Sequence, residues 1–77
     1  MEITIYTTPT CVYCKMAKKF FADNNVAYSE KDVQADMAAR EEMVKKSGQL
    51  GVPVIDIDGQ IVVGFDKERL ESLVLKK

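Results

Sequence analysis

The sequence contains no histidine, and it has only two cysteines and two prolines among 77 residues. Without histidine, no Cys–His pair can activate a thiol, which disfavours thiol proteases and related acyl-transfer enzymes. A zinc site needs four ligands, or three and a water molecule, and two cysteines supply too few within one chain. No apolar run approaches the length of a membrane-spanning helix. These absences leave few kinds of cysteine chemistry open, and they predict no metal site.

An excess of charge of one sign is also absent. The 11 basic and 12 acidic residues are interspersed and give a formal net charge of −1. No basic patch stands out to neutralise phosphates, so we expect no nucleic-acid partner. The chain opens on Met1-Glu2, without the basic region of a signal peptide, so we expect no membrane association and a cytoplasmic location. Its length predicts a single domain over residues 1–77, which we expect to be a monomer.

The first half of the chain carries one strand pattern, one helix pattern and a second, weaker strand. Residues 2–7 alternate between β-branched and polar types, which predicts a strand. Helical spacing of apolar residues follows, with Thr10 as the expected N-cap and Asn24-Asn25 as the expected end. Residues 26–32 predict the second strand. Three apolar residues of the helix are expected in the core: Met16, Phe20 and Phe21.

The second half predicts a helix, a hairpin and a last helix. Asp36 is the expected N-cap of the helix that ends at Gly48. Asp58-Gly59 between two apolar runs is a strong hairpin signal, which joins strands at 52–57 and 60–63. Asp66 is the expected N-cap of the last helix, with Leu70, Leu73 and Val74 facing inward. The order βαβαββα predicts an α/β fold: a mixed four-stranded sheet flanked by three helices. Helices between the early strands predict parallel pairing there.

Cys11 and Cys14 follow the first strand and stand at the start of the first helix. A thiol in a first helical turn meets unpaired N–H groups and the positive end of the helix dipole, and both favour the thiolate. Half of a zinc site and a pair of inert buried cysteines remain alternative readings of this C-x-x-C spacing. A redox couple accounts best for its position after a strand and a Pro-containing turn.

Three motifs together resemble the glutaredoxin family, which has the thioredoxin-like fold. They are Cys11-Val12-Tyr13-Cys14, Gly51-Val52-Pro53-Val54 and Val63-Gly64-Phe65-Asp66, and the resemblance covers essentially the whole chain. It implies a thiol–disulfide oxidoreductase in which Cys11 is the nucleophile and Cys14 resolves the mixed disulfide. It also implies no bound cofactor, with glutathione as co-substrate and disulfide-containing proteins or glutathione mixed disulfides as substrates.

The resemblance assigns further residues to the site, although each has a plainer reading. Pro53 is suited simply to open a strand, but the family implies a cis bond after Val52, whose backbone pairs with the substrate. Asp66 is a good N-cap, and the family implies that it and the N–H groups after Gly64 bind the γ-glutamyl end of glutathione. Tyr13 is suited simply to pack over the first helical turn, but the family implies that it flanks the bound thiol. The substrate and glutathione candidates are therefore Tyr13, Val52, Pro53, Gly64, Phe65 and Asp66.

Two departures from the family pattern leave the electron donor open. Thr8 stands where many glutathione-binding members carry a lysine, and Val12 stands where a proline is common. A valine there, and a Gly-Phe pair such as Gly64-Phe65, also occur in redoxins that serve ribonucleotide reductase and are reduced by thioredoxin reductase. A redoxin of that type is the alternative function. A non-redox binding module or an iron–sulfur carrier is a third.

Overall fold

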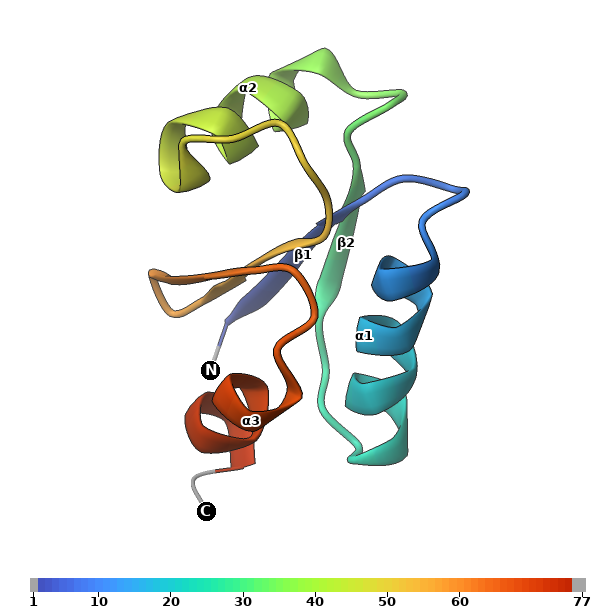
Figure 1. The fold of residues 1–77 in the computed structure, drawn as a ribbon, viewed down its shortest axis with the longest axis vertical. Coiled ribbons are helices and arrows are strands. Elements are labelled where there is room, and N and C mark those ends of the chain that lie inside the picture. Colours follow the sequence, from blue (N-terminus) through green and yellow to red (C-terminus); the bar gives the residue numbers. More distant parts are fainter. Residues whose placement is uncertain (1, 76–77) are drawn as a thin grey trace.

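The computed structural model describes residues 2–75, which form a four-stranded sheet covered by helices on both faces (Figure 1). The sheet has the order β2-β1-β3-β4, and it confirms the expected βαβαββα arrangement. The strands are β1 (Ile3–Thr7), β2 (Ser29–Asp32), β3 (Val54–Ile57) and β4 (Gln60–Val63). The helices are α1 (Val12–Asp23), α2 (Met37–Ser47) and α3 (Lys67–Leu70), which continues into a π-helical turn, η1 (Glu71–Leu75).

The central strand β1 pairs with β2 in parallel, as the intervening helix α1 predicts. Strand β2 begins later than expected, at Ser29 rather than at Val26. The residues before it are still tied to the end of α1, because Asn25 has a left-handed φ of 56° and the Val26 N–H donates to the Phe21 carbonyl at 2.8 Å. The chain must leave this turn before it can extend.

Strand β3 runs antiparallel to β1, with Tyr6 opposite Val54 and Ile3 opposite Ile57. The expectation of parallel pairing therefore holds for β1 and β2 but is wrong for β3. The reason lies in α2, which crosses one end of the sheet and does not return the chain to the other end (Figure 1). Strand β3 thus enters the sheet at the end where β1 and β2 finish.

The two faces of the sheet bury separate apolar clusters, as the two-residue period of a strand requires. Ile3 and Ile5 point to one face, under α1 and α3, whereas Tyr6 points to the other, under α2. The first cluster consists of Ile3, Ile5, Ala17, Phe20, Phe21, Ile55, Ile57, Val62 and Leu70. The second consists of Tyr6, Val33, Ala39, Met43 and Val54.

Local signals set the helix ends and the hairpin where the sequence predicts them. The Asp36 carboxylate accepts the Ala39 N–H at 3.1 Å, and α2 ends at Gly48, which has a φ of 75°. Asp58 and Gly59 both have positive φ, 50° and 92°, as a type I′ hairpin turn requires. This turn is tied to the start of β1: the Glu2 N–H donates to the Asp58 carboxylate at 2.7 Å, and the Asp58 N–H donates to the Glu2 carbonyl at 2.9 Å.

The last helix begins at its predicted cap, but it remains regular for only one turn. The Asp66 carboxylate accepts the Arg69 N–H at 3.2 Å, and Leu70 is fully buried. Beyond Leu70 the backbone widens into η1, where Leu73 and Val74 pack against the core as expected. No helix within residues 2–75 is long and apolar enough to cross a bilayer.

A polar cluster joins α2 to the sheet beneath it. The hydroxyl of the buried Tyr6 donates to the Glu42 carboxylate, and Lys31 lies 3.3 Å from the same carboxylate. The Lys46 ammonium lies 3.3 Å from Glu42 and 2.7 Å from Asp56 on β3. The Tyr6 hydrogen bond, followed by the two lysines, lowers the pKa of Glu42 to about 2. Glu42 is thus held as a carboxylate in the folded state.

Replacing Glu42 with glutamine should lower stability at neutral pH but not in strong acid. A carboxyl group whose folded pKa is depressed stabilises the protein above its unfolded value of about 4.3, and this stability is lost as the pH falls toward the folded value. The side chain is 40% exposed, so solvent screening limits the effect to about 1 kcal/mol. We expect this loss for E42Q at pH 7 and almost none at pH 2, measured by urea unfolding. E41Q removes a neighbouring exposed charge as the control, and equal losses at both pH values would contradict the assignment.

Candidate active site

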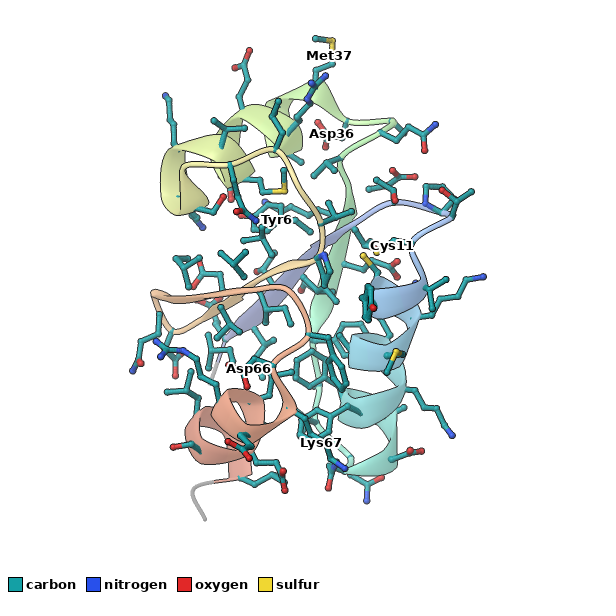
Figure 2. The ribbon with its side chains drawn as sticks, viewed as in Figure 1. Tyr6, Cys11, Asp36, Met37, Asp66 and Lys67 are labelled. Atoms are coloured by element: carbon teal, nitrogen blue, oxygen red, sulfur yellow. The ribbon has the colours of Figure 1, made fainter. Side chains whose placement is uncertain are left out.

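Cys11 is the N-cap residue of α1. Its backbone is extended, with φ −80° and ψ 115°, and its N–H donates to the Thr8 carbonyl at 3.3 Å. Its sulfur accepts the N–H of Cys14 at 3.1 Å. The prediction that Thr10 caps this helix is therefore wrong, because the cysteine sulfur one residue later takes the place of a capping oxygen. Figure 2 shows Cys11 at the start of α1.

This position makes Cys11 the better placed of the two sulfurs to carry negative charge. The side chain is partly exposed, so a disulfide from outside can reach it. It also receives a backbone N–H at the positive end of a 12-residue helix. Hydrogen bonds donated to the charged form of a group, and the helix dipole, both stabilise that form.

Cys14 lies in the opposite environment, fully buried beneath the first turn of α1. Burial raises the pKa of the Cys14 thiol, and its hydrogen bond with Cys11 acts in the same direction, against weaker opposing bonds to Thr7 and Thr8. Because the ordinary value already lies above neutral pH, Cys14 stays protonated there. The site therefore pairs an accessible sulfur with a sheltered one.

The register of the sheet brings distant candidates to the same end as the cysteines. Tyr6 is opposite Val54 in the β1–β3 pair, so Pro53 lies beside the end of β1. The Gly64 N–H then donates to the Pro53 carbonyl at 2.8 Å, which places the end of β4 against the start of β3. The Val52–Pro53 bond is cis, as the resemblance implies. Cys11, Pro53 and Gly64 thus lie at the same end of the sheet.

The surface around these residues is apolar and accessible. Val12 and Tyr13, which directly follow the nucleophile candidate, are 66% and 60% exposed. Phe65 is half-buried, with its ring 6.3 Å from that of Phe20 between centroids. Asp66 is exposed, and one carboxylate oxygen caps α3, which leaves the carboxylate further acceptor capacity.

Met16 is a correction to the predicted core. Phe20 and Phe21 are buried as expected, but Met16 is 44% exposed. It lies one turn after Val12 on the side of α1 that the sheet does not cover, above a hollow bordered by Phe20 and Phe65. Helical spacing identified an apolar stripe there, but its first two members, Val12 and Met16, are exposed.

The glutaredoxin family profile matches residues 3–62. The chain belongs to the glutaredoxin family. It is 47% identical over 74 residues to a glutaredoxin-like 8.6 kDa protein of the rubredoxin operon of Clostridium pasteurianum, a match that covers 96% of this chain and 99% of that protein. It is 42% identical over 65 residues to glutaredoxin 3 of Escherichia coli K12, which covers 84% of this chain and 78% of the relative.

Solved structures confirm the thioredoxin-like fold. The crystal structure of a thioredoxin-like protein superposes with a TM-score of 0.90 at 41% identity, and covers 95% of this chain and 100% of that one. A buckwheat glutaredoxin–glutathione complex superposes with a TM-score of 0.78 at 25% identity, and covers 95% of this chain and 73% of the other. Glutaredoxins are thiol–disulfide oxidoreductases, so this chain is an enzyme of that class.

In this glutaredoxin, Arg40 is a candidate site residue that sequence reasoning missed. It lines a hollow of about 390 Å³ together with Thr8, which precedes the cysteines, and with Leu50 from the loop before β3. A signal for it existed: Arg40 stands four residues after the cap Asp36, near the positive end of α2, where a cation gains nothing from the helix dipole. The fold therefore supplies a positive charge beside the uncharged Thr8.

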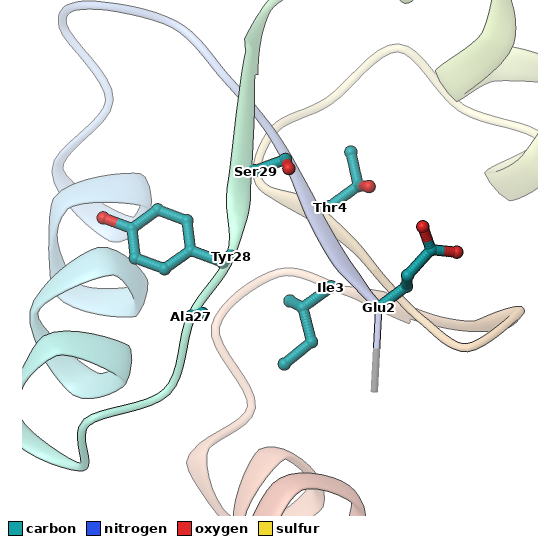
Figure 3. A pocket seen from close by; sticks show the side chains of 6 residues that line it. All are labelled: Glu2, Ile3, Thr4, Ala27, Tyr28 and Ser29. Atoms are coloured by element: carbon teal, nitrogen blue, oxygen red, sulfur yellow. The ribbon is translucent and has the colours of Figure 1, made fainter.

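A smaller hollow, of about 210 Å³, lies at the other end of the sheet (Figure 3). It lies where β1 and β2 begin, between Glu2 and Ser29. The Tyr28 ring turns away from it toward α1, where it packs 5.3 Å from the Phe21 ring between centroids. This hollow contains neither cysteine and is separate from the glutaredoxin site.

Proposed function

We propose that this protein is an electron carrier that reduces disulfides through a Cys11–Cys14 dithiol/disulfide cycle. The observation that carries the proposal is the asymmetry of the two sulfurs: Cys11 is accessible and accepts a backbone N–H, whereas Cys14 is buried and its pKa is raised by burial. An attacking group must be a thiolate within reach of substrate, and a resolving group needs only to reach the first sulfur.

The cycle moves two electrons and needs no bound cofactor. The Cys11 thiolate attacks one sulfur of a substrate disulfide, forms a mixed disulfide and releases the other substrate thiol. Cys14 then loses its proton and attacks the Cys11 sulfur, which releases the second thiol and leaves the Cys11–Cys14 disulfide. Two molecules of glutathione, or a disulfide reductase, return the pair to the dithiol. The substrates are disulfide-containing proteins or glutathione mixed disulfides.

For glutathione, we propose a site that runs between two charged side chains. The Asp66 carboxylate and the N–H groups after Gly64 receive the γ-glutamyl end. Arg40, in the hollow beside Thr8, receives the glycine carboxylate. The similarity to a buckwheat glutaredoxin solved with glutathione supports this assignment.

Between these ends, we propose that apolar and backbone groups hold the cysteinyl part of the ligand over Cys11. The Val52 backbone, before the cis Pro53, pairs with the ligand backbone, and the exposed ring of Tyr13 packs beside the bound thiol. Phe65 forms the wall after Gly64. These roles come from the family motif and from the position of each residue at the cysteine end of the sheet.

A ribonucleotide-reductase redoxin reduced by thioredoxin reductase is the second candidate, because Thr8 supplies no charge and Val12 replaces the usual proline. An iron–sulfur or non-redox role has less support. Within residues 2–75, no three His, Cys, Asp or Glu side chains gather where they could hold a metal ion. Visible absorbance after anaerobic purification tests that role directly.

The donor experiment compares two ways of reducing the Cys11–Cys14 disulfide. One assay contains glutathione, glutathione reductase and NADPH, and the other contains thioredoxin reductase and NADPH. We expect saturable turnover with glutathione, because Arg40 replaces the charge that Thr8 lacks. R40M should raise the KM for glutathione about 10- to 100-fold, the usual effect of losing one charge-assisted contact of about 1.5–3 kcal/mol.

R40K keeps the charge and should recover most of this loss, while both variants should react normally with dithiothreitol. Turnover with thioredoxin reductase but not with glutathione would favour the redoxin.

We also propose that residues 1–77 act as one monomeric domain in the cytoplasm, where reducing conditions regenerate a dithiol.

A further inference from the structure

Two adjoining hollows form a continuous apolar surface between α2 and the loop before β3. The outer one, of about 410 Å³, is lined by Met37, Arg40, Glu41, Val44, Lys45 and Leu50. The inner one also contains Met37, Arg40 and Leu50, and it ends at Thr8. We call the two hollows together the α2 groove.

The α2 groove contains large apolar side chains that are exposed and not buried in the core. Met37 is 71% exposed and Leu50 is 60% exposed, although both are large apolar side chains. Figure 2 shows the Met37 side chain extending outward from the first turn of α2. Contiguous exposed apolar residues bordered by polar ones are typical of surfaces that bind another molecule.

The groove is also preorganised. The Ser47 hydroxyl donates to the Met43 carbonyl at 2.8 Å and accepts the Gln49 N–H at 3.3 Å. Together with the left-handed Gly48, these bonds fix the turn that carries Leu50 back alongside α2. A surface that is already ordered loses little conformational entropy when a ligand binds.

The position of the α2 groove and the charges on its border indicate what kind of molecule binds there. The groove ends at Thr8, whose carbonyl accepts the Cys11 N–H, so a chain lying in it reaches the reactive sulfur. Its polar border carries two cations, Arg40 and Lys45, against one anion, Glu41. Among residues 2–75, neither cation makes an ion pair. The border therefore suits an acidic partner.

We propose that the α2 groove docks an extended segment of a disulfide-containing protein substrate, with an aliphatic side chain between Met37 and Leu50 and an acidic side chain beside Lys45. This inference rests on the proposed function, because the docked segment presents its disulfide to Cys11. The groove then makes the protein react faster with protein substrates that dock in it than with small disulfides, which do not reach it.

The test uses two short peptides whose single cysteine is joined in a disulfide to thionitrobenzoate. One peptide carries Leu and Asp on both sides of the cysteine, and the other carries Ser and Lys there. Cys11 attacks the peptide sulfur and releases thionitrobenzoate, the more acidic thiol, and Cys14 then releases the peptide. Bis(2-hydroxyethyl) disulfide, which is too small to reach the groove, measures the chemistry alone.

We expect the reduced protein to react about tenfold faster with the Leu/Asp peptide, because burying one aliphatic side chain has an effect of this size. The double variant M37S/L50S should lose most of this preference and keep its rate with bis(2-hydroxyethyl) disulfide. K45E should lose the smaller part of the preference, which comes from Asp. A22S, an exposed change at the far end of α1, is the matched control and should alter neither rate.

Equal rates for the two peptides, or a preference that M37S/L50S leaves undiminished, would overturn the proposal. Self-association that M37S/L50S abolishes, without any peptide preference, would show that the groove binds a second copy of this chain. Failure to reduce any disulfide would contradict the proposed function instead. In that case, fluorescence anisotropy with a labelled Leu/Asp peptide whose cysteine is replaced by serine still tests docking.

Discussion

The variant Cys11→Ser should lose disulfide reduction entirely, whereas Cys14→Ser should still attack disulfides and remain attached to them. Only Cys11 combines exposure with a backbone N–H donated to its sulfur. Burial holds Cys14 as a thiol at neutral pH, because it raises the pKa of that group. Cys14→Ser should therefore accumulate mixed disulfides with protein substrates, which can be trapped and identified by mass spectrometry.

Alkylation of the reduced wild-type protein provides the independent check. Iodoacetamide at pH 7 should modify Cys11 first and leave Cys14 largely unmodified, as peptide mapping would reveal. In 6 M urea, the two cysteines should be modified at similar rates, because unfolding removes both the burial of Cys14 and the helix start at Cys11. Equal or reversed labelling of the native protein would show that the roles of the two sulfurs are misassigned.

Replacing Asp66 should raise the KM for glutathione about tenfold or more. The reason is that we propose the Asp66 carboxylate as the group that binds the ammonium of the γ-glutamyl end. Asp66 also caps α3, so a loss of activity alone is ambiguous. Asp66→Asn separates the two roles, because asparagine caps a helix about as well as aspartate but carries no charge. Its free energy of unfolding should be nearly unchanged.

Asp66→Ala completes this comparison. It should show the same rise in the KM for glutathione and, in addition, a loss of about 1 kcal/mol in the free energy of unfolding, because the cap is gone. Reduction by dithiothreitol, which needs no tripeptide site, should be unaffected in both variants. An unchanged KM in Asp66→Asn would remove Asp66 from the glutathione site and would favour thioredoxin reductase as the donor.

Local signals in the sequence were sufficient wherever one residue decides the structure. Asp36 and Asp66 cap helices, and Asp58-Gly59 turns the hairpin, because each depends on only a few neighbouring backbone groups. Thr10 failed as a cap for a local reason as well: sulfur is absent from the usual capping preferences, yet Cys11 takes that position. The C-x-x-C pair was found because its geometry is contained within one helical turn.

Features that depend on distant parts of the chain could not be predicted from local signals in the sequence. The direction of β3 depends on how α2 crosses the sheet, and no spacing along the sequence encodes that path. Periodicity placed Met16 on an apolar face but could not show that its side chain remains 44% exposed. Arg40 and Thr8 line the same hollow only because α2 lies over the end of β1, so the position of Arg40 in its helix does not reveal that it lies near Thr8.

The reciprocal hydrogen bonds between Glu2 and Asp58 fix the start of β1 at the end of the sheet away from Cys11. Strand β1 has five residues, so its first and last Cα atoms are roughly 13 Å apart. A tether attached ahead of Glu2 therefore leaves Cys11 and the α2 groove facing solution. Attached to an electrode or a resin through that end, the protein would keep the surface around Cys11 accessible to molecules in solution.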